Sequence, residues 1–253
     1  MEKIDVFIPT IKKDFNILPY TVFSLKKIDH NINQIYIVSP EDNEIIDFCK
    51  TNGIQFISET DMIPLRKEDI TYSPKNINRA GWLYQQLLKL SADMVCNSEY
   101  ILILDSDTVF LRKQRFISNN KIRINYSKNE RHKPYLDFIN RIFPNFIFFP
   151  HSFVTHHFFV EKRILIELKE SINKETKLNW YSAIISNLDN NEVSSFSEYE
   201  LLGNYYYNKY RKNIFFSNFK NIGVSEDCFF NKKAKIKIFS LYYNSCSIHH
   251  YNS

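Results

Sequence analysis

Two carboxylates lie at the end of an apolar segment. The stretch ILILDSDTVFLR (101–112) places Asp105 and Asp107 directly after four consecutive aliphatic residues, a pattern typical of a strand buried on both faces. Mg²⁺ and Mn²⁺ take one or two carboxylates while a substrate diphosphate supplies other oxygen ligands. The spacing therefore predicts a metal site that stabilises a leaving diphosphate. The alternative is a pair of Asx turns, in which each aspartate binds its own backbone without a metal.

Two classes of enzyme place such an Asp-x-Asp sequence after a buried strand. In haloacid-dehalogenase-type phosphohydrolases the first aspartate, here Asp105, is a nucleophile. That motif opens its fold near the N-terminus and is completed by a second acidic pair, whereas here β-α-β sequence precedes it and no convincing second pair follows. Nucleotide-sugar glycosyltransferases of the GT-A type place the motif after their nucleotide-binding strands. The position in the chain favours the transferase.

Three segments follow one another in the chain: NRAGWLYQQLLKL (78–90), ILILDSDTVFLR (101–112) and SSFSEYELLGNYY (194–206). Together with the opening DVFIPT (5–10), they resemble a family of bacterial GT-A glycosyltransferase-like proteins associated with capsule and lipopolysaccharide synthesis. The resemblance implies a nucleotide-sugar donor, a UDP-sugar above all, with Mn²⁺ or Mg²⁺ as cofactor. It also implies a growing glycan or lipid-linked glycan as acceptor. A catalytically silent nucleotide-sugar-binding protein is a third possibility beside the transferase and the phosphohydrolase.

The resemblance places donor contacts in two segments, apart from Asp105 itself. Pro9 and Thr10 end the first strand, where such enzymes contact the nucleoside. The segment before the acidic pair contributes Arg79, Trp82, Gln85, Gln86 and Lys89. By helical spacing, positions 82, 85, 86 and 89 share one face, which offers stacking, amide hydrogen bonds and a cation for phosphate. The alternative is a partly solvated helix face with the tryptophan packed at its edge.

Two histidine pairs occur late in the chain. His156 and His157, in FVTHHFF (153–159), are expected beside the sugar or acceptor. His249, in SIHHYN (247–252), is a candidate third metal ligand because many GT-A enzymes use a histidine near the end of the chain. The alternative for each is a core histidine with its nitrogens satisfied.

Two glutamates are candidates for the general base that an inverting transfer needs. Glu198 and Glu200 lie in FSEYELLGNY at the start of an expected helix. Ser195 and Ser197 precede them at capping-box spacing, so either glutamate could instead close the helix terminus. We favour Glu198, because a residue at the mouth of the helix is freer to face a substrate, and keep Glu200 in reserve.

The elements that must position these residues follow from periodicity. Strands are predicted at 4–10, 34–40, 54–58 and 100–104, and helices at 20–28, 41–50, 161–172, 181–188 and from 197. A further helix begins at Arg79, with Leu83, Leu87, Leu90 and Met94 as its buried stripe. The pattern predicts an α/β fold forming one domain over 1–253, and the resemblance implies that this fold is GT-A-like. Residues 1–112 form a Rossmann-type nucleotide-sugar-binding half with a mostly parallel sheet flanked by helices, and 113–253 an α+β acceptor half.

Composition narrows the class of protein. The chain has 253 residues, 44% of them hydrophobic and 16% aromatic, which excludes disorder for its bulk. The four cysteines form no CxxC pair, so neither a disulfide framework nor a zinc site is expected. No stretch is long and apolar enough to span a membrane and no signal peptide is recognisable, which predicts a cytoplasmic protein.

The net charge of +5 is concentrated at the end of the chain. From Tyr205 onward there are two acidic residues and eight basic ones: Lys209, Arg211, Lys212, Lys220, Lys232, Lys233, Lys235 and Lys237. Basic residues interleaved with aromatic ones predict contact with the anionic inner face of the cytoplasmic membrane. No recognition motif supports nucleic acid as the anionic partner. A solvated lysine-rich face is the alternative.

Overall fold

The computed structural model describes residues 2–249, and for His249 the backbone alone. Its centre is a five-stranded sheet in the order β3-β2-β1-β4-β8. The strands are β1 (Lys3–Pro9), β2 (Asn31–Ser39), β3 (Gln55–Ser58), β4 (Tyr100–Leu104) and β8 (His157–Glu161). The first four pair in parallel and β8 runs antiparallel to β4. The predicted mostly parallel sheet is confirmed, with the acidic pair at the carboxyl end of β4.

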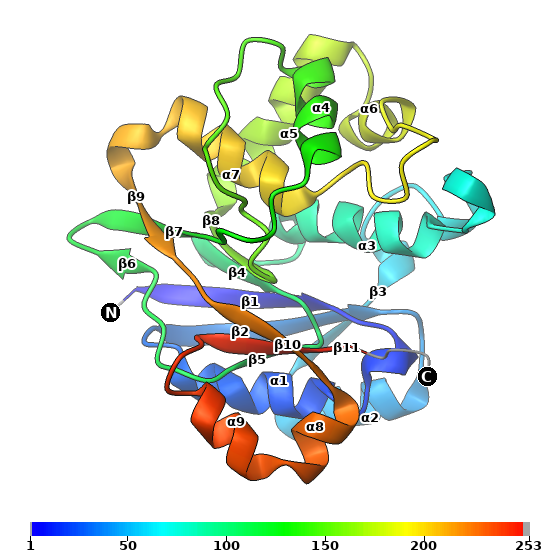
Figure 1. Ribbon diagram of the computed structural model, residues 1–253. Helices are drawn as coiled ribbons and strands as arrows, with labels where there is room; N and C mark the ends of the chain where they lie inside the picture. Colours follow the sequence, from blue (N-terminus) through cyan, green and yellow to red (C-terminus); the bar gives the residue numbers. More distant parts are fainter. Residues whose placement is uncertain (1, 250–253) are drawn as a thin grey trace.

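Helices cover both faces of this sheet (Figure 1). Below it in the view lie α1 (Leu18–Ser24) and α2 (Asn43–Asn52), and above it α3 (Ala80–Leu90), α4 (Lys133–Ile142), α5 (Lys162–Thr176), α6 (Trp180–Ser186) and α7 (Glu198–Lys209). Helix α2 shows how local sequence sets the bounds: Asp42 accepts from the amides of Glu44 and Ile45, and Gly53 closes the helix at a φ of 66°, a left-handed conformation that favours glycine.

The leucine stripe of α3 is confirmed except at its last member. Leu83, Leu87 and Leu90 are fully buried. The helix ends at Leu90, however, and the chain turns into a 3₁₀ segment (Ala92–Met94). Met94 therefore leaves the helical period and is 57% exposed, so its prediction as a core residue is wrong.

Two small sheets complete the fold, and one of them joins β5 of the first half to strands of the second. One, in the order β10-β11-β5, contains β5 (Thr108–Phe110), β10 (Asn221–Ser225) and β11 (Ser245–His249). The other, in the order β6-β7-β9, contains β6 (Ile117–Ser118), β7 (Lys121–Tyr126) and β9 (Ile214–Asn218). Because β11 pairs with β5 directly after the acidic turn, the amide of Ile248 donates to the carbonyl of Asp107 over 2.9 Å. The late segment of the chain is thereby fixed beside the two aspartates.

Helix α7 packs closely against the segment that leads into β8. A Cβ atom added at Gly203 would lie 2.1 Å from Cγ of Phe153, a distance that no side chain could occupy without moving the ring. Only glycine allows this approach. The close contact sets the position of the 153–156 segment, which carries His156.

Apart from Lys220, which lies between β9 and β10, the basic residues near the end of the chain are divided between two ends of the molecule. Lys209, Arg211 and Lys212 lie at the connection from α7 to β9, whereas three lysines lie on α9 (Lys233–Phe239) and Lys232 lies between it and α8 (Glu226–Asn231). Figure 1 shows these two regions at opposite ends of the fold. The sequence pattern therefore does not form one continuous basic surface.

Among residues 2–249 no helix is long and apolar enough to cross a membrane. The four cysteines form no disulfide within that range. Cys49, Cys96 and Cys246 are buried and Cys228 is partly exposed. Burial raises the pKa of Cys49 to about 11 and that of Cys246, which Asp107 raises further, to about 12. These two buried thiols therefore stay protonated near neutral pH.

Candidate active site

The acidic turn connects β4 to β5 and is held by its backbone. The amide of Asp105 donates to the carbonyl of His156 (3.1 Å), and the amide of Thr108 donates to the carbonyl of Asp105 (3.2 Å). The carboxylate of Asp105 accepts from other side chains, as described next, and that of Asp107 accepts from the hydroxyl of Thr108 at 3.2 Å. The described contacts of Asp105 thus differ from those of a simple Asx turn, because its carboxylate joins distant elements.

A buried lysine lies between two carboxylates. The ammonium of Lys89, on α3, is 2.5 Å from Oδ1 of Asp105 and 2.7 Å from Oε1 of Glu198, on α7. The hydroxyl of Tyr199 donates to the same Oδ1 over 2.6 Å, and Nδ1 of His156 lies 3.3 Å from Oδ2. Asp105 is therefore fixed by groups from three separate segments.

The charges of this cluster are set by competition between burial and pairing. Burial alone would raise the pKa of Asp105, but the Lys89 ammonium and His156 outweigh it and hold that pKa well below its usual range. Burial likewise opposes the charge on Lys89, and the two carboxylates overcome it, so its pKa is raised. For Glu198 burial prevails over the attraction of Lys89 and the pKa is raised. The stable core of the cluster is the Lys89–Asp105 ion pair.

A third carboxylate, Asp14, joins the acidic turn. It lies in the 3₁₀ segment Lys12–Asp14 after β1, and its Oδ2 accepts from the hydroxyl of Ser106 over 2.9 Å. Burial, then repulsion by Asp105 and Asp14, raises the pKa of Asp107 to about 6. Asp14 is not among the residues predicted from the sequence. The available signal was its position after β1, since the carboxyl ends of neighbouring parallel strands meet at one edge of a sheet.

These carboxylates suit a hard divalent cation. Their oxygens are the ligands that Mg²⁺ and Mn²⁺ prefer, and a cation would relieve the repulsion that raises the pKa of Asp107. Among the described residues, no three His, Cys, Asp or Glu side chains are already arranged around a metal position. The backbone of His249 follows Ile248, which is bonded to Asp107, but its side chain lies outside the described part of the structure.

Asp14 lines a cavity of about 310 Å³. Four predicted donor residues line it, namely Pro9, Thr10, Trp82 and Gln85, together with Asp14, Glu59 and Lys67. The amide of Gln85 lies 3.5 Å from the carbonyl of Pro9, which joins α3 to the end of β1. Pro9 and Thr10 are far in the sequence from Trp82 and Gln85, and all four line one concave site.

The other predicted donor residues lie outside the described lining of this cavity. Arg79 donates to the carbonyl of Val193 (3.1 Å) and its guanidinium lies 4.2 Å from the ring centre of Trp82. Gln86 and Lys89 are each only 4% exposed, and the Oε1 of Gln86 accepts from the amide of Glu198 at 3.2 Å. The predicted helix face is therefore divided, because α7 packs over positions 86 and 89 and leaves 82 and 85 to the cavity.

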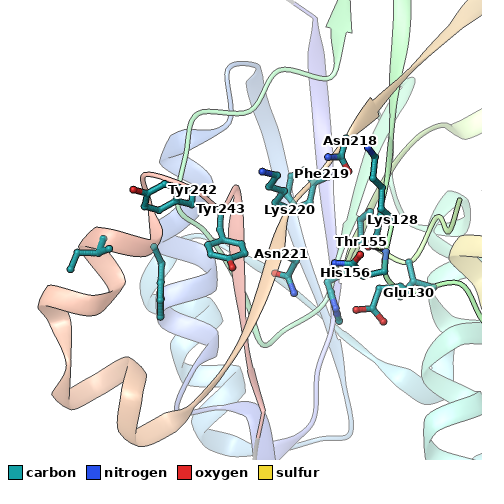
Figure 2. A pocket seen from close by; sticks show the side chains of 15 residues that line it. Lys128, Glu130, Thr155, His156, Asn218, Phe219, Lys220, Asn221, Tyr242 and Tyr243 are labelled. Carbon is teal, nitrogen blue, oxygen red and sulfur yellow. Dashed lines mark hydrogen bonds between the residues drawn. The ribbon is translucent and has the colours of Figure 1, made fainter.

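His156 lines a second cavity, of about 550 Å³. Figure 2 shows His156 at one end of it and Tyr242 at the other. The backbone of His156 has a φ of 62°, uncommon for a residue other than glycine and often found at functional sites. Its imidazole both lines the cavity and lies beside Asp105. The acidic turn is thus connected to both cavities, to the smaller through Asp14 and to the larger through His156.

The expectation that His157 contacts an acceptor is wrong. Its ring is 1% exposed, with Nε2 bonded to the amide of Asn125 (2.8 Å) and Nδ1 to the carbonyl of Thr155 (2.8 Å). It packs against Phe110, Phe116 and Phe219. Burial lowers its pKa to about 3, so it is a neutral core residue at the start of β8, whereas His156 precedes the strand with a φ of 62°.

The reason for choosing Glu198, its freedom to face a substrate, is also wrong in this structure. Its side chain is 3% exposed and paired with Lys89. The capping box from Ser195 does not form, because that hydroxyl contacts Tyr72 and the amide of Asp189. Ser197 does cap α7 by accepting from the amide of Glu200 over 3.3 Å.

Glu200 is equally buried but has different partners. Its Oε1 accepts from the hydroxyl of Ser152 (2.5 Å) and the amide of Phe153 (3.0 Å), and its Oε2 accepts from Asn204 (3.2 Å). The carboxylate therefore ties α7 to the segment before β8 and does not return to the backbone of Ser197, as a full capping box requires.

Comparison with known proteins identifies the family and the fold. The chain belongs to the family described as a family of unknown function (DUF6492), which matches residues 2–231. No curated protein sequence matches it. Among solved structures, the galactosyltransferase LgtC in complex with donor and acceptor sugar analogues is similar, with a TM-score of 0.52 and 10% identity over 97% of this chain and 87% of LgtC. An active-site mutant of LgtC gives 0.51 and 10% identity, over 98% and 88%.

A lower similarity, with a TM-score of 0.44 and 10% identity, covers 86% of this chain and 70% of glucosyl-3-phosphoglycerate synthase from Mycobacterium tuberculosis, solved with Mn²⁺, UDP and glucosyl-3-phosphoglycerate. At such identities the similarity to LgtC concerns the fold. The predicted GT-A fold class is confirmed.

Proposed function

We propose that this protein is a metal-dependent glycosyltransferase that moves a sugar from a nucleotide-diphosphate donor, a UDP-sugar, to a growing glycan of the bacterial surface, in capsule or lipopolysaccharide synthesis. The observation that carries the proposal is that side chains bonded to the acidic turn line two different cavities: Asp14, which accepts from Ser106, lines one, and His156, beside Asp105, lines the other. A transfer between two bound molecules needs such an arrangement. LgtC, which has the same fold class, holds donor and acceptor analogues in its structure.

In this proposal the smaller cavity binds the nucleotide. Trp82 offers a ring for stacking, while Thr10 and Gln85 offer hydrogen bonds. Asp107, with Asp105 and Asp14 nearby, would hold Mn²⁺ or Mg²⁺, which supplies charge neutralisation for the leaving diphosphate. Lys89 and Tyr199 keep Asp105 in one orientation through contacts of 2.5 and 2.6 Å. His156 lies where donor and acceptor would meet.

Melting temperature in the presence of UDP and MnCl₂ tests the proposal. A ligand that binds only the native state stabilises it by about 2.7 kcal/mol at a hundredfold excess over its Kd, so UDP with Mn²⁺ should raise the melting temperature and chelation should abolish the rise. Hydrolysis of a UDP-sugar should follow the same dependence. Phosphate release from a monoester would support the phosphohydrolase instead, and donor binding without turnover of any acceptor would support a silent binding protein.

For the base of an inverting transfer we keep Glu198 ahead of Glu200, because Lys89 connects Glu198 to Asp105, whereas Glu200 contacts the segment before β8. Replacing Glu198 by Gln should leave the melting temperature nearly unchanged, because the amide oxygen still accepts from Lys89 and the Lys89–Asp105 ion pair persists. Replacing Glu200 by Gln should lower the free energy of unfolding by about 1 to 3 kcal/mol, and the melting temperature with it, since one of the two accepting oxygens becomes a donor facing Asn204.

Turnover measured beside melting temperature distinguishes the roles. Loss of rate in Glu198→Gln with unchanged melting temperature identifies a chemical role for that carboxyl. If both variants transfer sugar normally, the base is another group or the enzyme retains configuration.

Membrane contact is proposed only for the end of the molecule that carries α9. There Lys233, Lys235 and Lys237 are exposed beside apolar side chains that are 54% exposed at Ile238, 64% at Leu241 and 63% at Tyr242. Lysines attract anionic lipid while exposed apolar groups enter the interface. A lipid-linked acceptor at the inner face of the cytoplasmic membrane would lie next to the larger cavity, which Ile238 and Tyr242 also line.

Co-sedimentation with phosphatidylglycerol vesicles checks this contact. Changing Lys233, Lys235 and Lys237 together to Gln should weaken binding by about 1 kcal/mol per charge. The matched control changes Lys209, Arg211 and Lys212, at the opposite end of the fold, and should bind as the wild type does. Equal binding of the wild type to neutral and anionic vesicles at low salt would remove the proposal.

A further inference from the structure

We infer that the larger cavity selects an anionic sugar, bearing a phosphate or a carboxylate, as the acceptor. The inference rests on the proposed function, which makes this cavity the acceptor site. It concerns what the acceptor is, and it depends on side chains that have no part in the metal or donor site.

Two lysines from separate segments line this cavity. Lys128 lies in the loop after β7, and Lys220 lies in the connection from β9 to β10. Figure 2 shows both on the same side of the cavity, near Asn218 and Phe219. Neither ammonium belongs to an ion pair among the residues from 2 to 249. Both charges are therefore available to an anionic ligand.

The backbone that carries Lys220 is rigidly held. Its amide donates to Oδ1 of Asn244 (3.0 Å), and its carbonyl accepts from the amide of Asn244 (2.7 Å). The neighbouring Phe219 is 3% exposed and packs on the core ring of His157 at a centroid distance of 4.4 Å. A cation on a fixed loop loses less conformational entropy on binding than one on a mobile loop. Lys220 therefore extends from a part of the cavity lining whose backbone is fixed.

The rest of the lining suits a sugar ring. Asn221 accepts from the hydroxyl of Ser245 (2.7 Å) and donates to that of Ser247 (3.1 Å), which fixes its amide. Tyr243 and Phe239, in edge contact at 6.0 Å, supply apolar surface. The only acidic side chain in the described lining is Glu130, so the two lysines leave an excess of positive charge. Polar, apolar and cationic groups together fit a sugar that carries an anion.

The size of the cavity excludes the larger anionic partners. A volume of about 550 Å³ is within the range of small-molecule sites, whereas a bilayer or a nucleic-acid duplex would meet only the outer surface. The lysines of α9 proposed for membrane contact are not among the residues that line the cavity. The two proposals can therefore be tested with different variants.

Binding of free sugars, measured by isothermal titration calorimetry, tests the inference. Glucose 6-phosphate provides the phosphate, N-acetylneuraminate provides the carboxylate, and glucose is the neutral reference. We expect at least one anionic sugar to bind about tenfold or more tightly than glucose, because a hydrogen bond to a charged group contributes more than a neutral one. The anionic sugar that binds more tightly shows whether the cavity prefers a phosphate or a carboxylate on the acceptor.

Variants then connect binding to the two lysines. Lys128→Gln and Lys220→Gln should each raise the Kd of the preferred anionic sugar about tenfold and leave that of glucose unchanged. Lys121→Gln is the matched control. This exposed lysine is the first residue of β7, the strand that precedes Lys128, and it does not line the cavity. Its Kd should equal that of the wild type.

The possible results separate the inference from the proposed function. Equal affinity for glucose and both anionic sugars, or unchanged affinity in both lysine variants, would overturn the inference even where UDP and Mn²⁺ raise the melting temperature. Absence of any response to UDP with Mn²⁺ would overturn the proposed function, and the acceptor role of the cavity with it.

Discussion

Asp107→Ala should reduce sugar transfer by roughly 10²- to 10³-fold or more, the loss that follows removal of one preorganised electrostatic group. The same variant should lose the rise in melting temperature that UDP and Mn²⁺ give the wild type. Its melting temperature without ligand should be unchanged or higher. Burial and the charges of Asp105 and Asp14 raise the pKa of Asp107 to about 6, which shows that its ionised form is disfavoured where it lies.

Two further variants test whether the loss is due to the charge of Asp107. Asp107→Asn keeps the size of the side chain and removes its charge, so it should be as inactive as the alanine variant if a cation is held there. Asp47→Ala changes a carboxylate that is 75% exposed, on α2, and should behave as the wild type. Near-normal transfer by Asp107→Ala in a defined assay would show that the metal assignment is wrong.

What could be predicted from the sequence is governed by local patterns. The aliphatic run 101–104 specifies a buried strand, and the rule that ligands bind at the carboxyl ends of parallel strands then locates Asp105 and Asp107. The same rule places Pro9 and Thr10, and helical period brings Trp82 and Gln85 to their cavity. In each case the information lies within about one element.

The predictions that were wrong concern residues whose surroundings are set by segments far away in the sequence. Gln86 and Lys89 have the spacing of a ligand-facing helix side, but α7, more than a hundred residues later, covers them. His157 follows His156 directly, and the two rings separate because β8 begins between them. The larger cavity draws on loops at 127–130, 218–221 and 242–243, whose meeting no local period encodes.

Lys89→Met should lower the stability of the native state by about 3 to 5 kcal/mol, the usual cost of removing one partner of a buried ion pair. Methionine has nearly the same shape, so the loss reflects charge. Asp105 would keep only Tyr199 and His156, and Glu198 would lose its described ion-pair partner. At about 2 to 4 °C per kcal/mol for a chain of this size, the melting temperature should fall by roughly 6 to 20 °C.

Lys133→Met is the matched control, because the same substitution then breaks an ion pair whose lysine is 81% exposed, and such a pair contributes about 0.3 to 0.5 kcal/mol.

The decisive measurement is a double-mutant cycle with Glu198→Gln. If the ammonium stabilises the fold by compensating two carboxylates, the second change should recover part of the loss, since only Asp105 is then left to solvate. The double variant could instead lose more stability than the two single variants lose together. That result would show that Glu198 is held by partners other than Lys89. Donor binding gives an independent readout: without Lys89, Asp105 is no longer fixed at 2.5 Å, so the response to UDP and Mn²⁺ should weaken in Lys89→Met and persist in Lys133→Met.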